Sequence, residues 1–102
     1  MSIVVIATAL PLPEHRAEVV AEFEDAIGRV HDEAGVEVYA LHESPDRLVM
    51  IEKYASAEAQ AAHVRGAALA ELMAAVNGKL ASPLDVQVLT PHPVGDPRKG
   101  AL

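Results

Sequence analysis

Apolar residues follow two different spacings along the chain, and these spacings predict four strands and two long helices. Residues 2–10 and 48–54 are nearly continuous apolar runs rich in β-branched side chains, a pattern typical of strands buried on both faces. Residues 36–43 alternate with a period of two, and residues 84–90 form another short apolar segment. These four segments are the predicted strands.

The two remaining stretches carry apolar residues every three or four positions, which is helical spacing. The first covers about residues 14–33, with Pro13 in its first turn, where the missing N–H costs nothing, and Gly35 beyond its end. The second is predicted as one helix over residues 57–77, with Ser56 as its N-cap. Its predicted apolar stripe is Ala62, Gly66, Leu69, Met73 and Val76.

The segment Ser44-Pro45-Asp46-Arg47 predicts a tight turn, so the second and third strands should form a hairpin. With a two-residue loop, Tyr39 lies opposite Glu52, and a register error of one residue would separate them. The alternation sorts this hairpin into two faces, with Tyr39, Leu41, Met50, Glu52 and Tyr54 on one and Val36, Val38 and Ala40 on the other.

The element order is therefore β-α-β-β-α-β, which predicts a ferredoxin-like α+β fold with two helices on one face of a four-stranded antiparallel sheet. We assign residues 1–91 to a single domain and residues 92–102 to a C-terminal tail without periodicity. The tail is expected to be either disordered or in contact with a partner subunit.

Three of the predicted strands carry apolar side chains on both faces, although two helices can cover only one. The uncovered face would expose several hundred Å² of apolar surface, more than monomers usually tolerate. We therefore predict a face-to-face homodimer. The opposed apolar residues are Ile3, Val5 and Ala7 against Val4 and Ile6, Leu48 and Met50 against Val49 and Ile51, and Val86 and Val88 against Leu89.

Composition narrows the choice of partners. Eight Lys and Arg against fifteen Asp and Glu give a net charge of −7, which argues against nucleic acid and anionic membranes. No cysteine is present, so disulfides and thiolate chemistry are excluded. The first residues lack the basic start of a signal peptide, and their apolar run falls short of the ~20 residues of a spanning helix. We expect a cytoplasmic protein.

Three stretches carry a family resemblance: the opening IVVIATALPLPEHRAEV, the turn at residues 32–35 leading into VEVYALHES, and Ile51-Glu52-Lys53-Tyr54 followed by a helix with the pair Ala62-His63. Over about residues 2–91 the chain resembles the antibiotic biosynthesis monooxygenase family, also called quinol monooxygenase-like. The resemblance implies a dimeric α+β barrel. Haem-degrading relatives typically have an asparagine and a tryptophan where this chain has Thr8 and Tyr54, so haem is disfavoured.

Six residues are candidates for a site. His63 is the candidate base, since imidazole titrates near neutrality, although it could be partly exposed on a closely packed helix. Glu52 in an apolar strand could orient His63, act as a base, or pair with a lysine or arginine of the partner. Tyr39 and Tyr54 could bind a substrate oxygen or be ordinary sheet aromatics. Met50 and Met73 would line the substrate pocket or belong to the core.

The sequence contains no signature of a built-in cofactor. His31-Asp32-Glu33 are consecutive residues that would not converge on a metal in a helix, and no H-E-x-x-H spacing exists. Glycine-rich phosphate loops and a nucleophile elbow are also lacking. We predict no metal, flavin or nicotinamide cofactor.

The leading functional hypothesis is a cofactor-independent monooxygenase that oxidises a phenolic, quinol or polycyclic aromatic substrate with O₂. The alternative is a non-catalytic dimeric module that binds a small apolar ligand or serves in protein interactions. An isomerase or a haem-degrading enzyme is less favoured. A cavity beside His63 would support the enzyme, and side chains filling that space would support the module.

Overall fold

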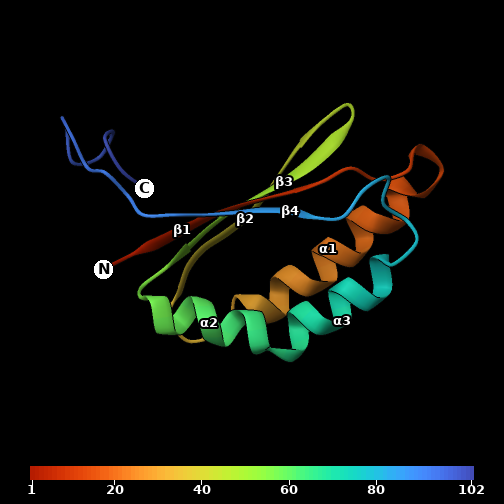
Figure 1. Ribbon diagram of the computed structural model, residues 1–102, viewed down its shortest axis with the longest axis horizontal. Helices are drawn as coiled ribbons and strands as arrows, with labels where there is room; N and C mark the ends of the chain where they lie inside the picture. The colour runs from red at the N-terminus through yellow and green to blue at the C-terminus, as the bar shows by residue number, and fades with distance from the viewer.

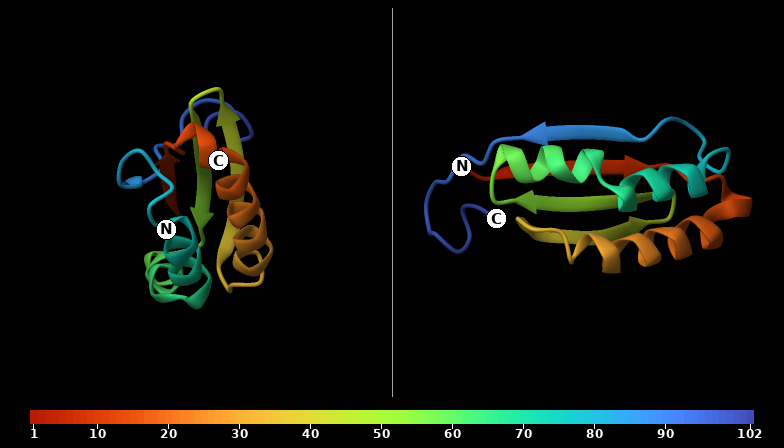
Figure 2. Two further views of the ribbon diagram at one scale, coloured as in Figure 1. Left: turned by 90° about the vertical axis from the view of Figure 1, so that its right-hand side faces the viewer. Right: turned by 90° about the horizontal axis from the view of Figure 1, so that it is seen from below.

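A computed structural model describes all 102 residues and contains a four-stranded antiparallel sheet with every helix on one side (Figure 1). Figure 2 shows this layered arrangement along two other directions. The strand order is β2-β3-β1-β4, which confirms the predicted ferredoxin-like α+β fold. The elements are β1 (Ile3–Ala9), η1 (Pro13–His15), α1 (Arg16–Val30), β2 (Val36–Ser44), β3 (Arg47–Tyr54), α2 (Ala57–Arg65), α3 (Ala67–Val76) and β4 (Asp85–Leu89).

The first helix follows its predicted pattern. It begins with the short 3-10 turn η1, which has Pro13 at its first position, and continues as α1. Its buried side chains are spaced four, three and four residues apart, as expected for one apolar stripe facing the sheet. They are Val19, Phe23, Ala26 and Val30.

The second helix differs from its prediction because it is broken at Gly66. Gly66 has the extended backbone angles φ −76° and ψ 158°, so α2 ends at Arg65 and α3 begins at Ala67. The N-cap is confirmed, since Ala59 N donates to Ser56 Oγ at 3.1 Å. The break changes the helical phase, so the predicted stripe is confirmed only in part: Val76 is buried, Leu69 and Met73 are partly buried against the core, and Ala62 is exposed. The buried residues are His63, Ala68, Leu72 and Val76.

The hairpin has its predicted register over most of its length. Ser44 pairs with Arg47 across a two-residue loop, and Tyr39 lies opposite Glu52. An irregularity between Val36 and Val38 changes the pairing at the other end. There Val36 pairs with Tyr54 and joins the core, so its predicted place on the face of Val38 was wrong.

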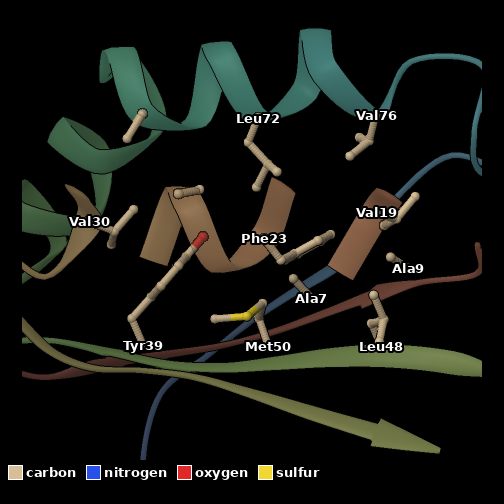
Figure 3. Close-up of a cluster of buried hydrophobic side chains, with 12 residues drawn as sticks. Ala7, Ala9, Val19, Phe23, Val30, Tyr39, Leu48, Met50, Leu72 and Val76 are labelled. Carbon is tan, nitrogen blue, oxygen red and sulfur yellow. The ribbon is translucent and has the colours of Figure 1, made fainter. Parts of the chain in front are cut away.

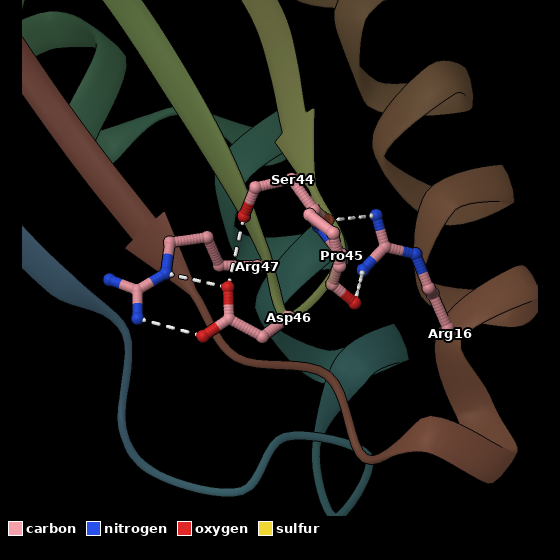
Figure 4. A network of polar contacts seen from close by, with 5 residues as sticks. All are labelled: Arg16, Ser44, Pro45, Asp46 and Arg47. Atoms are coloured by element: carbon pink, nitrogen blue, oxygen red, sulfur yellow. Dashed lines mark hydrogen bonds and ion pairs between the residues drawn. The ribbon is translucent and has the colours of Figure 1, made fainter.

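The tip of this hairpin is fixed by two arginines (Figure 4). Arg16 on α1 donates to the carbonyl oxygens of Ser44, at 2.8 Å, and of Pro45, at 3.1 Å. Arg47 donates to Asp46 with two nitrogens, and this contact lowers the pKa of Asp46 to about 2. These contacts hold the two-residue loop and with it the register that places Tyr39 opposite Glu52.

The hydrophobic core lies between the sheet and the helices, where twelve buried residues form one cluster (Figure 3). The sheet contributes Leu48 and Met50, the first helix contributes Phe23, and α3 contributes Leu72. Tyr39 also belongs to this cluster, and its side chain rises from the sheet with the hydroxyl towards the helices. The core therefore includes one of the two tyrosines proposed for the site.

The edge strand β4 is short and its side chains are exposed, including Val86 and Val88. Beyond it, residues 90–102 form neither helix nor strand, and the chain curls back beside the N-terminus (Figure 1). Whether this tail contacts a partner stays a prediction. None of the helices combines the length and the apolar character needed to cross a bilayer.

Gly35 is the residue on which the α1–β2 turn depends. Its φ is +82°, and a Cβ there would lie 2.5 Å from Ala59 Cβ. We expect Gly35→Ala to lower the free energy of unfolding by about 2–4 kcal/mol, through left-handed strain and overlap with α2. Gly28→Ala is the control, because a Cβ at this helical position meets nothing within 4 Å. It should stabilise by about 0.5–1 kcal/mol in urea unfolding, and equal effects of the two changes would contradict this account.

Candidate active site

His63 lies in the last turn of α2 and is only 4% exposed, so the expectation of a partly exposed ring is not met. Its Nδ1 is 2.8 Å from Oε1 of Glu33. Two tyrosine rings contact the imidazole, with centroid separations of 5.3 Å for Tyr39 and 5.4 Å for Tyr54. The ring is therefore held between a carboxylate and two aromatic rings.

The second ring nitrogen of His63, Nε2, is not fully buried. Nε2 has no hydrogen-bond partner in the protein, yet no fully buried side-chain nitrogen or oxygen lacks a partner. Because the two ring nitrogens point in different directions, Nε2 faces away from Glu33. The imidazole thus offers one nitrogen to a ligand while the other is occupied.

The sequence patterns placed Glu33 at the end of the first helix and in a rejected metal cluster, and they did not predict its contact with His63. The pairing of β2 with β3 is a signal that could have indicated this contact. Val36 begins β2 and pairs with Tyr54 at the end of β3, so the segments on either side of this pair must lie together. Residues 33–35 precede one strand and residues 55–57 follow the other. A backbone bond from Ala55 N to Gly35 O, at 2.8 Å, joins these segments.

Glu52 does not orient His63 by a hydrogen bond in this structure. It is 4% exposed, and its Oε1 accepts a hydrogen bond of 2.6 Å from the hydroxyl of Tyr54. Burial raises the pKa of Glu52, while the bond from Tyr54 and the nearby His63 oppose that rise. The carboxyl therefore has a partner within its own chain.

The two tyrosines occupy different positions. Tyr54 has no exposed surface, and its hydroxyl is committed to Glu52. Burial, followed by the contact with Glu52, raises the pKa of Tyr54. Tyr39 lines a cavity, and its hydroxyl has no partner in the protein. Burial is also the main reason that the pKa of Tyr39 is raised, so both phenols stay protonated at neutral pH.

A cavity of about 350 Å³ lies between the sheet and the helices α2 and α3. Its polar side chains are those of Tyr39, Glu52, Gln60 and His63, and the rest of its wall is aliphatic apart from Phe23. Met50 and Met73 both contribute to this wall, while Tyr54 does not. Five of the six candidate residues thus meet around one cavity, and the sixth supports the carboxyl of Glu52.

A second, more open hollow of about 450 Å³ lies on the other side of His63. Small residues form much of it, including Ala59, Gly66 and Ala67. Glu33 and Arg29 also line it. His63 is the one residue that borders both spaces. Neither space has three His, Cys, Asp or Glu side chains grouped as for a metal ion.

Comparison with known proteins identifies the family of this fold. Residues 2–75 match the model of the antibiotic biosynthesis monooxygenase family, so the chain belongs to that family. No curated protein matches the chain.

Solved structures agree with this assignment. The chain is similar to the protein Rv0793 from Mycobacterium tuberculosis, with a TM-score of 0.87 and 30% identity over 94% of this chain and 100% of that one. It is also similar to a candidate antibiotic biosynthesis monooxygenase from Caulobacter crescentus, with a TM-score of 0.81 and 28% identity over 86% of this chain and 87% of that one. A protein from Methanosarcina mazei shares the fold, with a TM-score of 0.83 and 20% identity over 87% of this chain and 91% of that one.

The raised pKa of Glu52 predicts a pH dependence of stability. The folded state favours the protonated carboxyl of Glu52. The contribution of this carboxyl to the free energy of unfolding is therefore fully present at pH values below the pKa of an exposed glutamate. This contribution is lost as the pH rises through the pKa of Glu52 in the folded protein. Glu52→Gln removes this loss, so the variant should gain free energy of unfolding relative to the parent as pH increases from 4 to 8.

Denaturant unfolding at several pH values measures this difference. Glu24→Gln, an exposed change on α1, is the control and should leave the pH dependence unaltered. A constant difference between Glu52→Gln and the parent across the range would show that Glu52 keeps an ordinary pKa.

Proposed function

We propose that the protein is a monooxygenase that uses O₂, without a cofactor of its own, to oxidise a small, uncharged phenol or quinol. The observation that carries this proposal is the buried imidazole of His63, with a partner-free Nε2 beside an apolar cavity. A base in a dry pocket next to a substrate hydroxyl is the main requirement of this chemistry. Membership of the antibiotic biosynthesis monooxygenase family supports the same reaction class.

The reaction needs one base and a sheltered space. His63 Nε2 takes the proton of the substrate hydroxyl, and the resulting anion passes one electron to O₂. The substrate radical and superoxide then combine through a new C–O bond to form a peroxide. The O–O bond breaks, one oxygen stays in the product as a carbonyl, and the other leaves as water. The two hydrogens of that water come from the substrate, one of them returned by His63, so the substrate supplies all four electrons.

The cavity wall indicates what kind of substrate fits. No lysine or arginine lines it, so nothing there would neutralise a carboxylate or phosphate. A volume of about 350 Å³ is near the lower end of ligand pockets, which favours one or two fused rings. In this proposal Met50 and Met73 contact the rings and the Tyr39 hydroxyl binds a substrate oxygen. Glu52, braced by Tyr54, donates or accepts a hydrogen bond at the polar end.

We also propose that the protein is a homodimer through the uncovered face of the sheet. The register places Ala40, Ile51 and Ile6 in one row on that face, with Val49 in the next. No helix lies over this face of the sheet (Figure 2). Each 100 Å² of apolar surface removed from water contributes about 2.5 kcal/mol before the costs of association. A second copy supplies a surface of matching size and character.

The dimer predicts a specific sedimentation result. At micromolar concentration the particle should have twice the chain mass of 10.8 kDa. Ile51→Glu should shift it to the monomer, because an unpaired carboxylate would be buried between two apolar faces. Ala17→Glu adds the same charge on the exposed side of α1 and should leave the dimer intact. A parent protein that sediments as a monomer would refute this interface.

The activity predicts O₂ consumption with an uncharged naphthohydroquinone as substrate, measured with an oxygen electrode and by product absorbance. His63→Ala should lower kcat/KM by about 10²-fold or more, the usual contribution of a general base. A naphthohydroquinone carrying a carboxylate should be a poor substrate, because the cavity offers no cation. His15→Ala, at an exposed histidine bonded to Glu18, should retain the parental rate.

The same experiment separates the alternatives. Saturable binding of the quinol without O₂ uptake would favour a non-catalytic binding module. Turnover that persists without oxygen would favour an isomerase, which needs the same base and pocket. Either outcome would overturn the monooxygenase proposal.

A further inference from the structure

We infer that Glu33 is the positioning residue of the site: it fixes the proton of His63 on Nδ1, keeps Nε2 free as a base, and compensates the charge when the ring is protonated. The catalytic part of this inference rests on the proposed function. The structural part, which ring nitrogen carries the proton, can be tested without any substrate.

The geometry of the contact supports a fixed tautomer. Glu33 Oε1 lies 2.8 Å from His63 Nδ1, and the histidine side chain is only 5% exposed, so water hardly competes for this nitrogen. An ionised carboxylate can only accept hydrogen bonds, so the neutral ring must carry its hydrogen on Nδ1. Nε2 is then unprotonated and points away from Glu33, where a substrate hydroxyl can reach it.

No lysine or arginine forms an ion pair with Glu33. Arg29 lines the same outer hollow, but its guanidinium pairs with Asp25 and Glu71. His63 is the only group in an ion pair or side-chain hydrogen bond with Glu33. The carboxylate is therefore available to the imidazolium that forms when Nε2 accepts a proton, as with the acid that supports histidine in a catalytic triad.

Two glycines lie next to the groups that surround Glu33. Gly35 lets the turn approach α2, since a Cβ there would overlap with Ala59. Gly66 lies beside the carboxylate, since a Cβ there would be 3.4 Å from Glu33 Oε2, about van der Waals distance. Gly66 is also the N-cap of α3, and the start of a helix favours a negative charge. The carboxylate of Glu33 therefore lies next to the break in the second helix, at a place that stabilises an anion.

His63 separates the two spaces of the site, and Glu33 belongs only to the outer one. The substrate in the inner cavity therefore meets the base, whereas the supporting carboxylate stays 25% exposed behind it. This arrangement keeps the charge of Glu33 partly solvated and out of the apolar cavity. A carboxylate inside that cavity would need a partner, as Glu52 does.

Nitrogen-15 NMR of the five histidines, with the His63 signals assigned from a His63→Gln sample, tests the tautomer. In the parent, neutral His63 should be protonated on Nδ1. Glu33→Ala should yield a mixture with a large Nε2-protonated fraction, and Asp32→Asn, an adjacent exposed change of equal charge, should match the parent. An Nε2-protonated parent, or an unchanged tautomer in Glu33→Ala, would overturn the inference.

Kinetics with the naphthohydroquinone test the catalytic consequence. Glu33→Ala should lower kcat about 10- to 100-fold with KM changed by less than about threefold, because it affects the base and not substrate binding. Glu33→Gln should be intermediate, since its amide keeps an acceptor without the charge. Circular dichroism confirms folding, and if Glu33→Ala does not fold, the isosteric Glu33→Gln carries the test.

The two hypotheses fail separately. A tautomer that depends on Glu33 in a protein without oxygenase activity would refute the proposed function and leave the inference standing. Activity that requires His63 but has an unaltered kcat in Glu33→Ala would refute the inference and leave the proposed function standing.

Discussion

The pairing of β2 with β3 is the constraint on which the site depends. Because the strands are antiparallel and Val36 pairs with Tyr54, the end of the first helix and the start of α2 must meet at one end of the sheet. Glu33 and His63 are thirty positions apart in sequence but become neighbours through this pairing. At the other end of the hairpin, Arg16 and Asp46 hold the tight loop that maintains the register.

The polar groups of the site are arranged so that each buried charge has a partner. Glu52 is bonded to Tyr54, Glu33 is bonded to His63, and no fully buried polar side-chain atom is left without a partner. An apolar layer tolerates polar groups only under this condition, because each unpaired one costs several kcal/mol in the worst case. The remaining open positions, Nε2 of His63 and the hydroxyl of Tyr39, are therefore where a ligand can gain hydrogen bonds that the protein itself does not make.

Local patterns in the sequence were sufficient for the fold. Strand alternation, proline and glycine signals and the Ser56 cap predicted every strand and the first helix to within a few residues. They failed at Gly66, where one extended residue shifts the helical phase, and at Val36, where the irregular pairing turns one side chain to the other face. Both features are backbone conformations of one or two residues that depend on tertiary packing. Side-chain periodicity carries little information about them.

The site was predictable only in part, for the same reason. Tyr39 was correctly placed opposite Glu52 because hairpin register is a local property, and His63 lies on the helix that follows the same hairpin. The partnership of Glu33 with His63, and the commitment of Tyr54 to Glu52, depend on how a turn and two short helices pack. Patterns within single elements placed Glu33 at the end of a helix. Such patterns carry no information about which residue packs against that end.

The aromatic composition gives the site a built-in optical signal. The chain has no tryptophan and only two tyrosines, and the rings of both lie against His63. Near-ultraviolet absorption and fluorescence of the protein therefore arise almost entirely from side chains that touch the imidazole. Ligand entry or a change in the ionisation of the ring can be followed by light in the unlabelled, unmodified protein.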